Sequence, residues 1–547
     1  MDVVGLKTTH DGAVALIKDD ELIFSIEEEK ISNNARYAKI GDFNDSIKIV
    51  EQYADPSRCK FVLDGWYKTH KTLFLSGHEV EVKLAPYRRG IWSDDILQPY
   101  NYSMLDLKYT SYSHYAGHVA SAYCTSPFAK AGEDAYVLAW DSHMLPYLYH
   151  VSYRTGKIRS VGFLHYMMAE TYCILANLFP PFDHPRQYPD VLGVGGRLMA
   201  YVATGTADEE YIVSLEKAYV FAQKTVCGDP NNLTDRDIHP GFCDRFAEAM
   251  VKALKEKKFK ADDMLASIHE YMGEKLLVGL REIAKKDGFK TSNFCLSGGA
   301  ALNIKWNSRI RGLDFVENLW VPPFPNDAGS AIGAACCELL KNTDVRYIKW
   351  SAYAGPELNN AEIRSAWEAV DCSIPDLALV IHAENEPVVV LNGRAELGPR
   401  ALGHRSIIAA CTDASMKDKI NIAKRREWYR PVSPICLEEH APSIFSPGTP
   451  DPYMLYDHFI RAEWLKKIPA VSHLDETARL QTVSAESCPH LHSLLTAYYE
   501  LSGVPVLCNT SANMNSCGFF PDVQSAMDWG RLDRIWSDGK LYRKRAE

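Results

Sequence analysis

The 547-residue sequence has 14 cysteines but no Cys-x-x-Cys pair, so its cysteines indicate neither a zinc knuckle nor a small disulfide framework. No basic stretch followed by an apolar one opens the chain, which argues against a signal peptide. No apolar run approaches the roughly 18 residues that a membrane-spanning helix needs. These absences predict a soluble, cytoplasmic protein with reduced thiols and no membrane partner.

The sequence also lacks internal repeats, low-complexity tracts and an excess of positive charge. Its formal net charge is -10, which argues against indiscriminate binding to nucleic acid or acidic membranes. A local basic cleft is still compatible with this charge, because basic residues gather between Lys417 and Arg430. The length predicts about two to four domains.

Three short apolar stretches separated by turn residues open the chain and predict a β-meander. A similar group follows later, and helical periodicity comes after each group. The stretches are Val3–Leu6, Gly12–Lys18, Leu22–Glu27, Tyr136–Trp140, Tyr147–Val151 and Ile158–Leu164, and the later helical segments are Glu209–Gln223 and Phe246–Lys286. This α/β layout, a duplicated meander with helices, is typical of the actin/Hsp70-type ATPase superfamily.

A change in composition marks a domain boundary at about residue 352. Gly355-Pro356 and Asn359-Asn360 are typical of a loop or linker. We therefore expect one domain over residues 1–352 and a second over 353–547. The second is expected to begin with a helix at Ala361–Val370 and a strand at Val388–Asn392.

A metal site is indicated by two histidines and two aspartates. His114 and His118 are four residues apart, so on a helix both imidazoles lie on one face. Asp141 ends an apolar strand, and Asp327 begins a helix after a proline-rich segment. Two imidazoles and two carboxylates suit Fe²⁺, Mn²⁺ or Zn²⁺. An incidental pair of helix histidines is the alternative.

Glycine turns before helices indicate a nucleotide site, because they let phosphate approach the backbone at a helix N-terminus. A plain structural turn is the alternative at each position. The candidate residues are Asp11, Gly12, Gly298, Gly299, Asn303 and Gly329, and His10 precedes the first of them.

The C-terminal part is rich in arginines that lie between Gly, Pro and apolar residues, which predicts a phosphate-binding site. An ordinary solvated basic surface is the alternative. The candidates are Arg394, Arg400, Arg405, Lys424, Arg425, Arg426, Arg430, Arg479, Ser511 and Asn513.

Taken together, these motifs make the sequence resemble the O-carbamoyltransferases of antibiotic biosynthesis and of nodulation-factor tailoring. The motifs are HDGAVAL, SHYAGH, LSGGAALN, PPFPNDAGSAIGAA, GRAELGPRALGHRS, REWYRPVSP, DETARLQTV and NTSAN. They occur in the family's order and cover both expected domains.

The resemblance implies a threonylcarbamoyl-transferase-like first domain and a YrdC-like second domain. By it, the second domain makes carbamoyl-adenylate from carbamoyl phosphate and ATP, with Mg²⁺, and the first transfers the carbamoyl group to a hydroxylated acceptor. It also assigns the metal, preferably iron, to His114, His118, Asp141 and Asp327. It assigns carbamoyl phosphate and adenylate to Arg400, Lys424, Arg430, Arg479, Ser511 and Asn513, and catalysis to His10.

The sequence departs from the family in two places. The strand aspartate is followed here by Ser142-His143 instead of glycine. The family's basic segment after three glutamates is replaced by a stretch in which Arg36 or Lys39 is the expected catalytic cation.

The acceptor stays open in the sequence. A small natural product or sugar is the first expectation, and a hydroxymethyl pyrimidine, free or in DNA, is the second, since the aromatic-rich segment Lys68–Tyr115 could stack a base. Threonylcarbamoyl transfer to tRNA is a rival activity, and a degenerate ATPase-fold binding protein is a rival without one. A homodimer is compatible with the sequence.

Overall fold

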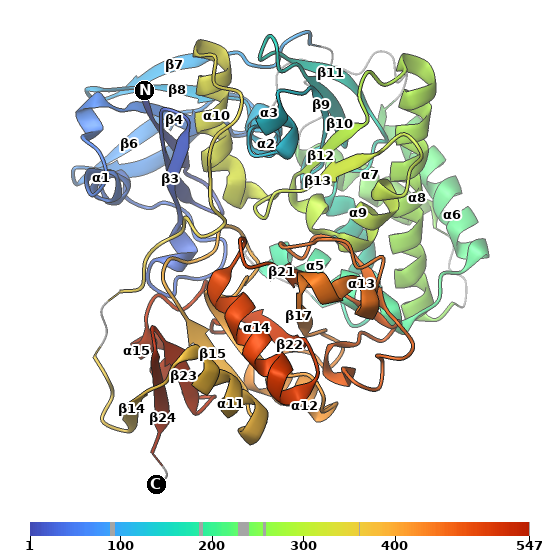
Figure 1. Cartoon of the computed structure of the whole chain (residues 1–547). Helices are drawn as coiled ribbons and strands as arrows, with labels where there is room; N and C mark the ends of the chain where they lie inside the picture. Colours follow the sequence, from blue (N-terminus) through green and yellow to red (C-terminus); the bar gives the residue numbers. More distant parts are fainter. Residues whose placement is uncertain (88–92, 185–189, 228–239, 255–258, 360–361, 546–547) are drawn as a thin grey trace. The chain divides into compact units, whose positions relative to one another are not determined.

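The computed structural model describes residues 1–87, 93–184, 190–227, 240–254, 259–359 and 362–545, which form two compact units. Unit 1 comprises residues 1–25 and 37–351, and unit 2 comprises residues 26–36 and 352–547 (Figure 1). Unit 2 therefore includes a short segment from near the N-terminus, which the sequence analysis had placed within the first domain.

Unit 1 contains two mixed sheets with a related strand order, β3-β2-β1-β4-β8-β7 and β11-β10-β9-β12-β13. In the first, β1 pairs antiparallel with β2 and parallel with β4; in the second, β9 pairs antiparallel with β10 and parallel with β12. The repeated layout expected from the sequence is thus present in the topology, while membership of the ATPase superfamily stays a prediction. The strands are β1 Asp2–Lys7, β2 Ala13–Lys18, β3 Glu21–Glu27, β4 Lys60–Asp64, β7 Tyr100–Met104, β8 Leu107–Tyr112, β9 Ala135–Ala139, β10 Tyr147–Val151, β11 Ile158–Phe163, β12 Asn293–Ser297 and β13 Asn318–Trp320, with β5 His70–Leu75 and β6 His78–Lys83 as a separate hairpin.

Helices α2 (His114–Cys124) and α10 (Ser330–Asn342) connect the two sheets. Helix α10 contacts β1, β2 and β4, helix α2 contacts β9 and β12, and the two helices contact each other (Figure 1). Every residue of α2, and α10 from Ser330 to Leu340, is buried, which explains why both sequences are rich in small and apolar residues. The crossing is close enough that a Cβ on Gly333 would lie 2.1 Å from the Gly117 carbonyl oxygen.

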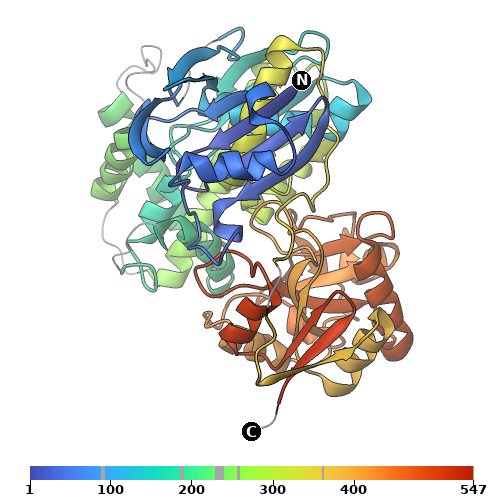
Figure 2. The same cartoon turned by 90° about the vertical axis from the view of Figure 1, so that its left-hand side faces the viewer.

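The remaining helices of unit 1 include a group in which α4, α6, α7 and α8 pack on one another, shown in green and teal in Figures 1 and 2. The continuous helical stretch expected over Phe246–Lys286 is two helices, since α7 ends at Ala253 and α8 begins at Ala261. The helices are α1 Phe43–Glu51, α3 Pro127–Ala131, α4 Glu170–Ala176, α5 Val194–Tyr201, α6 Glu209–Ala222, α7 Pro240–Ala253, α8 Ala261–Asp287 and α9 Ile304–Arg311.

Unit 2 is built on one sheet with the order β14-β24-β23-β15-β16-β22-β17-β21. The helix expected at Ala361–Val370 is wrong where the chain is described, because Trp367–Asp371 is strand β14, paired antiparallel with β24. The helix begins later, where Ser373 and Asp376 form a capping box and Pro375 occupies the first turn of α11. The strands are β14 Trp367–Asp371, β15 Val388–Leu391, β16 Arg405–Ala410, β17 Ser433–Leu437, β21 Gln481–Val483, β22 Val506–Ser511, β23 Arg534–Ser537 and β24 Lys540–Lys544, with a small sheet of β18 Phe445–Ser446, β19 His458–Ile460 and β20 Thr477–Ala478; the helices are α11 Ile374–Glu384, α12 Ser415–Ala423, α13 Ala441–Ile444, α14 Pro489–Ser502 and α15 Val523–Trp529.

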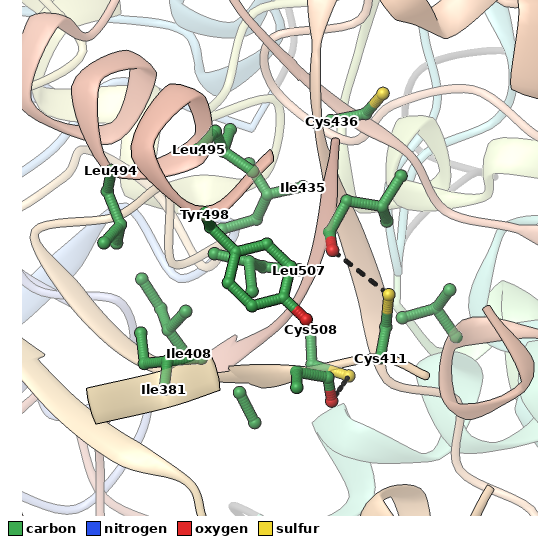
Figure 3. Packing of buried hydrophobic residues seen from close by; sticks show 14 of the residues in the cluster. Ile381, Ile408, Cys411, Ile435, Cys436, Leu494, Leu495, Tyr498, Leu507 and Cys508 are labelled. Atoms are coloured by element: carbon green, nitrogen blue, oxygen red, sulfur yellow. Dashed lines mark hydrogen bonds between the residues drawn. The ribbon is translucent and has the colours of Figure 1, made fainter. Parts of the chain in front are cut away.

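The core of unit 2 lies where helices α11 and α14 cover strands of this sheet. Tyr498 of α14 belongs to one buried hydrophobic cluster with Leu507 of β22 and Ile408 of β16 (Figure 3). Two buried thiols use backbone carbonyls here, since Cys411 donates to Val506 O at 3.1 Å and Cys508 to Ala410 O at 3.5 Å. All 14 cysteines lie in the described residues and none is in a disulfide, as the sequence predicted. Within those residues every helix is too short or too polar to cross a bilayer.

The glycine contact between α2 and α10 gives a stability prediction. Gly333→Ala should lower the free energy of unfolding by about 1–3 kcal/mol, because backbone atoms of Gly117 already occupy the space that the new methyl group needs. Denaturant unfolding measures the change. Gly196→Ala in α5, where a Cβ meets no atom within 4 Å, is the matched control and should not destabilise. Equal stability of wild type and Gly333→Ala would show that this crossing is not tightly packed.

Candidate active sites

Two predicted metal ligands lie on helix α2, which begins where Ser113 caps its N-terminus by accepting from the Ala116 backbone N–H. His114 and His118 are both fully buried, one turn apart, with their Nε2 atoms 3.1 Å apart. Gly333 of α10 allows that helix to pass close to the backbone of Gly117, which lies between the two histidines, and a Cβ on Gly117 itself would lie 3.0 Å from the Asp64 carboxylate. The helix crossing therefore also fixes where these two imidazoles lie.

The two predicted carboxylates lie beside the same imidazoles. Nε2 of His118 is 3.2 Å from an Asp327 oxygen and 3.5 Å from an Asp141 oxygen. Nε2 of His114 is 3.3 Å from the same oxygen of Asp327. Donor atoms of His114, His118 and Asp327 thus lie within 4.8 Å of one another in a buried space, with Asp141 beside His118, and a mixed nitrogen and oxygen set of this kind fits Fe²⁺, Mn²⁺ or Zn²⁺. Metal binding itself stays a prediction.

A carboxylate and a lysine that the sequence analysis did not include support this group. Asp64, at the end of β4, accepts from Nδ1 of His114 at 2.7 Å, which leaves Nε2 facing the other donors. Lys7, at the end of β1, lies between Asp64 at 3.0 Å and Asp327 at 2.7 Å. The sequence contained a signal for both residues, because each is a charged residue at the end of an apolar strand. Asp141 follows just after the end of such a strand.

The pKa values in this network show how the buried charges compensate each other. Burial tends to lower the pKa of Lys7, but the carboxylates of Asp327 and Asp64 raise it. Burial tends to raise the pKa of Asp327, but Lys7 and His114 hold it well below its usual range. For His114, burial is outweighed by Asp64 and Asp327, and the pKa is raised to about 9.

His10 lies at the edge of the same group, in the loop after β1. Its Nδ1 is 2.9 Å from Asp11 and 3.5 Å from Asp327. Its ring packs edge-on against Trp66, at 5.4 Å between centroids. Asn326 donates to the other oxygen of Asp11 at 3.2 Å. The carboxylate of Asp11 is thus positioned to orient the His10 ring and leave Nε2 available.

The predicted nucleotide glycines have structural explanations of their own. A Cβ would lie 2.5 Å from Ile40 N at Gly12, 2.2 Å from Trp140 O at Gly298, and 2.3 Å from Phe324 O at Gly329. Close packing therefore requires glycine at these positions, and nucleotide binding by them stays a prediction.

Two further members of this predicted set, Gly299 and Asn303, also have local partners. Gly299 donates its N–H to Asp141 at 2.6 Å, which fixes the carboxylate beside His118. Asn303 caps α9 by accepting from the Trp306 N–H.

In unit 2, the predicted phosphate residues come together around Lys424, at the C-terminus of α12. Its ammonium donates to Ser511 O at 2.5 Å, to Asn513 O at 3.0 Å and to the Asn513 side-chain oxygen. Arg426 reaches the Ser511 hydroxyl at 3.4 Å, and Arg479 donates to the Ser433 hydroxyl at 3.1 Å. These partners are neutral, so they satisfy hydrogen bonds without cancelling charge.

The cations of unit 2 repel one another. Burial lowers the pKa of Lys424 well below its ordinary value, and Arg426, Arg36 and Arg430 lower it further. The pKa of Arg426 is lowered by burial and then by Arg430, Arg479 and Arg36, and that of Arg479 is lowered to about 10 by burial and by Arg430. We call these five residues, Arg36, Lys424, Arg426, Arg430 and Arg479, the basic cluster. Such a cluster is stabilised by an anion.

The expected catalytic cations are in different units. Arg36 belongs to the segment of residues 26–36 that is part of unit 2, and its backbone N–H donates to the backbone oxygen of Ser516 at 2.9 Å. Lys39 is exposed in unit 1, and backbone atoms of residues 38–40 pack against Gly12. Arg400 lies half-buried in the loop between β15 and β16. The catalytic set His10, Arg36 and Lys39 is therefore divided between the two units.

Comparison with known protein families gives two matches along the chain. A family model described as the carbamoyltransferase N-terminus matches residues 2–336, and one described as the carbamoyltransferase C-terminus matches residues 380–535. The chain belongs to the carbamoyltransferase family. It is accordingly an enzyme that transfers a carbamoyl group.

Relatives match this carbamoyltransferase over its whole length. Nodulation protein U of Rhizobium tropici is 45% identical, with 100% of this chain and 96% of the relative covered. Nodulation protein U of Bradyrhizobium diazoefficiens is 42% identical, with 100% and 97% covered. The 3'-hydroxymethylcephem-O-carbamoyltransferase of Streptomyces clavuligerus is 29% identical, with 100% and 99% covered.

The role of Asp64 gives a prediction for metal affinity. Asp64→Asn should weaken binding of Fe²⁺ or Mn²⁺ roughly 10- to 100-fold, because the neutral amide orients and polarises His114 less well. Metal titration of the purified chain measures the affinity. Asp134→Asn is the matched control, since Asp134 faces His150 at 3.3 Å away from these donors. Unchanged affinity in Asp64→Asn would show that Asp64 does not support a metal ligand.

Proposed function

We propose that this carbamoyltransferase is ATP-dependent and acts on a hydroxyl. In the proposal, unit 2 converts carbamoyl phosphate to carbamoyl-adenylate, and unit 1 transfers the carbamoyl group to the acceptor oxygen. The names of the cephem-carbamoylating relatives support a hydroxyl acceptor. The observation that carries the assignment of activation to unit 2 is the basic cluster, in which Lys424 is buried and the four arginines are half-buried.

The basic cluster suits carbamoyl phosphate and ATP because both carry phosphate groups with more than one negative charge. Arginine guanidinium groups bind phosphate oxygens in pairs, and the low polarity of a buried site strengthens each contact. Lys424 is held by oxygens of Ser511 and Asn513, so its ammonium has a fixed place. The same cations would stabilise the charge that develops on phosphate as the bonds break.

The proposed activation balances with one water molecule. Carbamoyl phosphate, ATP and water give carbamoyl-adenylate, pyrophosphate and inorganic phosphate. The bond between the carbamoyl group and phosphate breaks, and a carbamate oxygen then forms a bond to the α-phosphorus of ATP as pyrophosphate leaves. Magnesium is expected to accompany ATP. A sheltered site is needed because the activated carbamoyl group is open to attack by water.

In the transfer step, the acceptor oxygen forms a bond to the carbamoyl carbon as the bond to AMP breaks. His10 would take the proton of the acceptor hydroxyl through Nε2, and the hydrogen bond between its Nδ1 and Asp11 supports this role. A metal bound by His114, His118, Asp141 and Asp327 would polarise the carbamoyl oxygen. Lys7 keeps the Asp327 carboxylate ionised and in place next to this group.

The acceptor is proposed to be a ring-bearing alcohol, because Trp66, which packs against His10, lies in a group of aromatic side chains. Trp66 lies 4.8 Å from Tyr67 and 6.2 Å from Tyr87 between ring centroids, and Tyr87 lies 4.6 Å from His114. Rings of this kind stack on sugars and on bases alike. They are compatible with a sugar or small natural product and also with a hydroxymethyl pyrimidine.

The first prediction from this proposal concerns unit 2. Lys424→Met should reduce carbamoyl-phosphate-dependent release of pyrophosphate from ATP by roughly 100-fold or more, because a buried charge that contacts the developing anion is removed. Lys419→Met, on the same helix but exposed and paired with Glu386, is the control and should retain activity. Full activity in Lys424→Met would place activation somewhere other than the basic cluster.

A second prediction separates the two half-reactions. His114→Ala should abolish carbamoyl transfer, read as the mass gain of one carbamoyl group on a panel of hydroxylated acceptors. The same variant should still release pyrophosphate in the presence of carbamoyl phosphate, because its basic cluster is intact. Loss of pyrophosphate release in His114→Ala would mean that the two units are assigned the wrong way round.

A further inference from the structure

A second cluster of metal-binding side chains lies in unit 2 and has no part in the proposed activation. His404, Cys488 and His490 each offer one ligand atom, and these atoms all lie within 4.8 Å of one another. Sγ of Cys488 is 3.5 Å from Nδ1 of His490, and the two imidazole centroids are 4.6 Å apart. His404 precedes strand β16, whereas Cys488 and His490 lie at the beginning of α14. The fold therefore brings together residues that are far apart in the sequence.

The hydrogen bonds of the two imidazoles leave a lone pair on each ring. Nδ1 of His404 is 2.7 Å from the Arg394 carbonyl oxygen, which can only accept, so this nitrogen carries the proton and Nε2 does not. Nε2 of His490 donates in the same way to Gly403 O at 3.3 Å, which leaves its Nδ1 unprotonated and facing Cys488. In metal-binding histidines, the ring nitrogen that does not bind the metal usually donates its hydrogen to an acceptor such as a backbone carbonyl.

Neighbouring groups hold the rings in these positions and keep them neutral. The ring of Tyr353 stacks on His404 at 3.8 Å between centroids, and its hydroxyl donates to Leu402 O at 3.1 Å. Burial lowers the pKa of His404 to about 4 and lowers that of His490 as well, so both imidazoles are in the form that binds metal.

We propose that His404, Cys488 and His490 bind Zn²⁺ as a second metal site of this enzyme. One thiolate and two imidazoles form a ligand set that Zn²⁺ favours, with a water molecule in the fourth, open position. The Sγ to Nδ1 distance of 3.5 Å matches the roughly 3.5 Å expected between two ligands of a tetrahedral zinc ion.

Binding requires that Cys488 lose its thiol proton to solvent as the zinc–sulfur bond forms. Burial raises the pKa of this thiol to about 11, and the charge of the metal has to offset that rise. The site joins the end of the loop that carries Arg400 to the beginning of α14, so zinc would limit the motion of a loop that is expected to contact carbamoyl phosphate.

Cobalt substitution tests the proposal independently of activity. Full-length protein is stripped of metal with a chelator and titrated with Co²⁺, and the near-ultraviolet band of charge transfer from thiolate to cobalt is followed. The donors in unit 1 include no thiolate, so cobalt bound there adds nothing to this band. We expect the band to saturate with a single equivalent bound at this site and to disappear when Zn²⁺ is added.

Variants identify the ligands. Cys488→Ser should lose the band, and Cys517→Ser, which changes another cysteine of unit 2 that is more accessible, should keep it. His490→Gln retains the thiol and should weaken cobalt binding at least 10-fold, which keeps the test valid if circular dichroism shows that Cys488→Ser does not fold. Absence of the band in the wild type, or an unchanged band in both Cys488→Ser and His490→Gln, would overturn the proposal.

Discussion

The ion pair between Lys7 and Asp327 is the interaction on which the arrangement of unit 1 depends. Both residues are buried, and an isolated charge in such a place would cost several kcal/mol. Lys7 comes from the first sheet and Asp327 from the segment just before α10, so the pair fixes the beginning of that helix against the sheet. Helix α2, with His114 and His118, then packs on α10 through the contact between Gly117 and Gly333. Electrostatics and close packing therefore position the same donors.

Unit 2 solves the problem of buried charge differently. Lys424, Arg426 and Arg479 of its basic cluster contact neutral hydroxyl, amide and carbonyl oxygens, whereas Arg430 lies 3.5 Å from Glu427 and Arg36 lies 4.0 Å from Glu29. The members of the cluster lower one another's pKa values. In unit 1, Lys7 has two carboxylates; in unit 2, the contacts of Lys424 are with Ser511 and Asn513. The network of unit 1, in which positive and negative side chains balance, suits a metal cation that stays bound and takes the place of some of these ion pairs. A cluster of like charges suits an anion that enters and leaves, as a phosphate substrate does.

The segment of residues 26–36 shows that the basic cluster is not confined to the C-terminal sequence. Lys30 is buried in unit 2 and donates to Glu27 at 2.6 Å and to the carbonyls of Glu396 and Gly398 at 2.7 Å each. Glu27 accepts from the Gly398 N–H at 2.9 Å. These contacts lie just before Arg400, and the same segment brings Arg36 to the cluster. A unit 2 that lacked this segment would lose both a cation and a support of the loop.

Much of this could be predicted because the signals were local in the sequence. The strands of both meanders, the histidine pair on a helix and the arginines between Gly and Pro each have a short pattern. Asp64 and Lys7 were missed because a charged residue at a strand end becomes informative only when the neighbouring strand is known. The helix expected at Ala361–Val370 was wrong where the chain is described because Trp367–Asp371 pairs with β24 as an edge strand, and such pairing with a distant strand overrides local helical periodicity.

The cluster of His404, Cys488 and His490 was still harder to predict from the sequence, because it also depends on contacts between distant segments. A search for metal motifs looks for ligands at short fixed spacings, and Cys488 and His490 alone are too small a set to stand out. The third residue, His404, is recognisable as a partner only because β16 and α14 are brought together in the fold. Its ring is oriented by Tyr353 and by the Arg394 carbonyl, neither of which has a chemical signature in the sequence. What distinguishes this group from three unrelated polar residues is the direction in which each ring nitrogen donates, and that is a property of the folded chain.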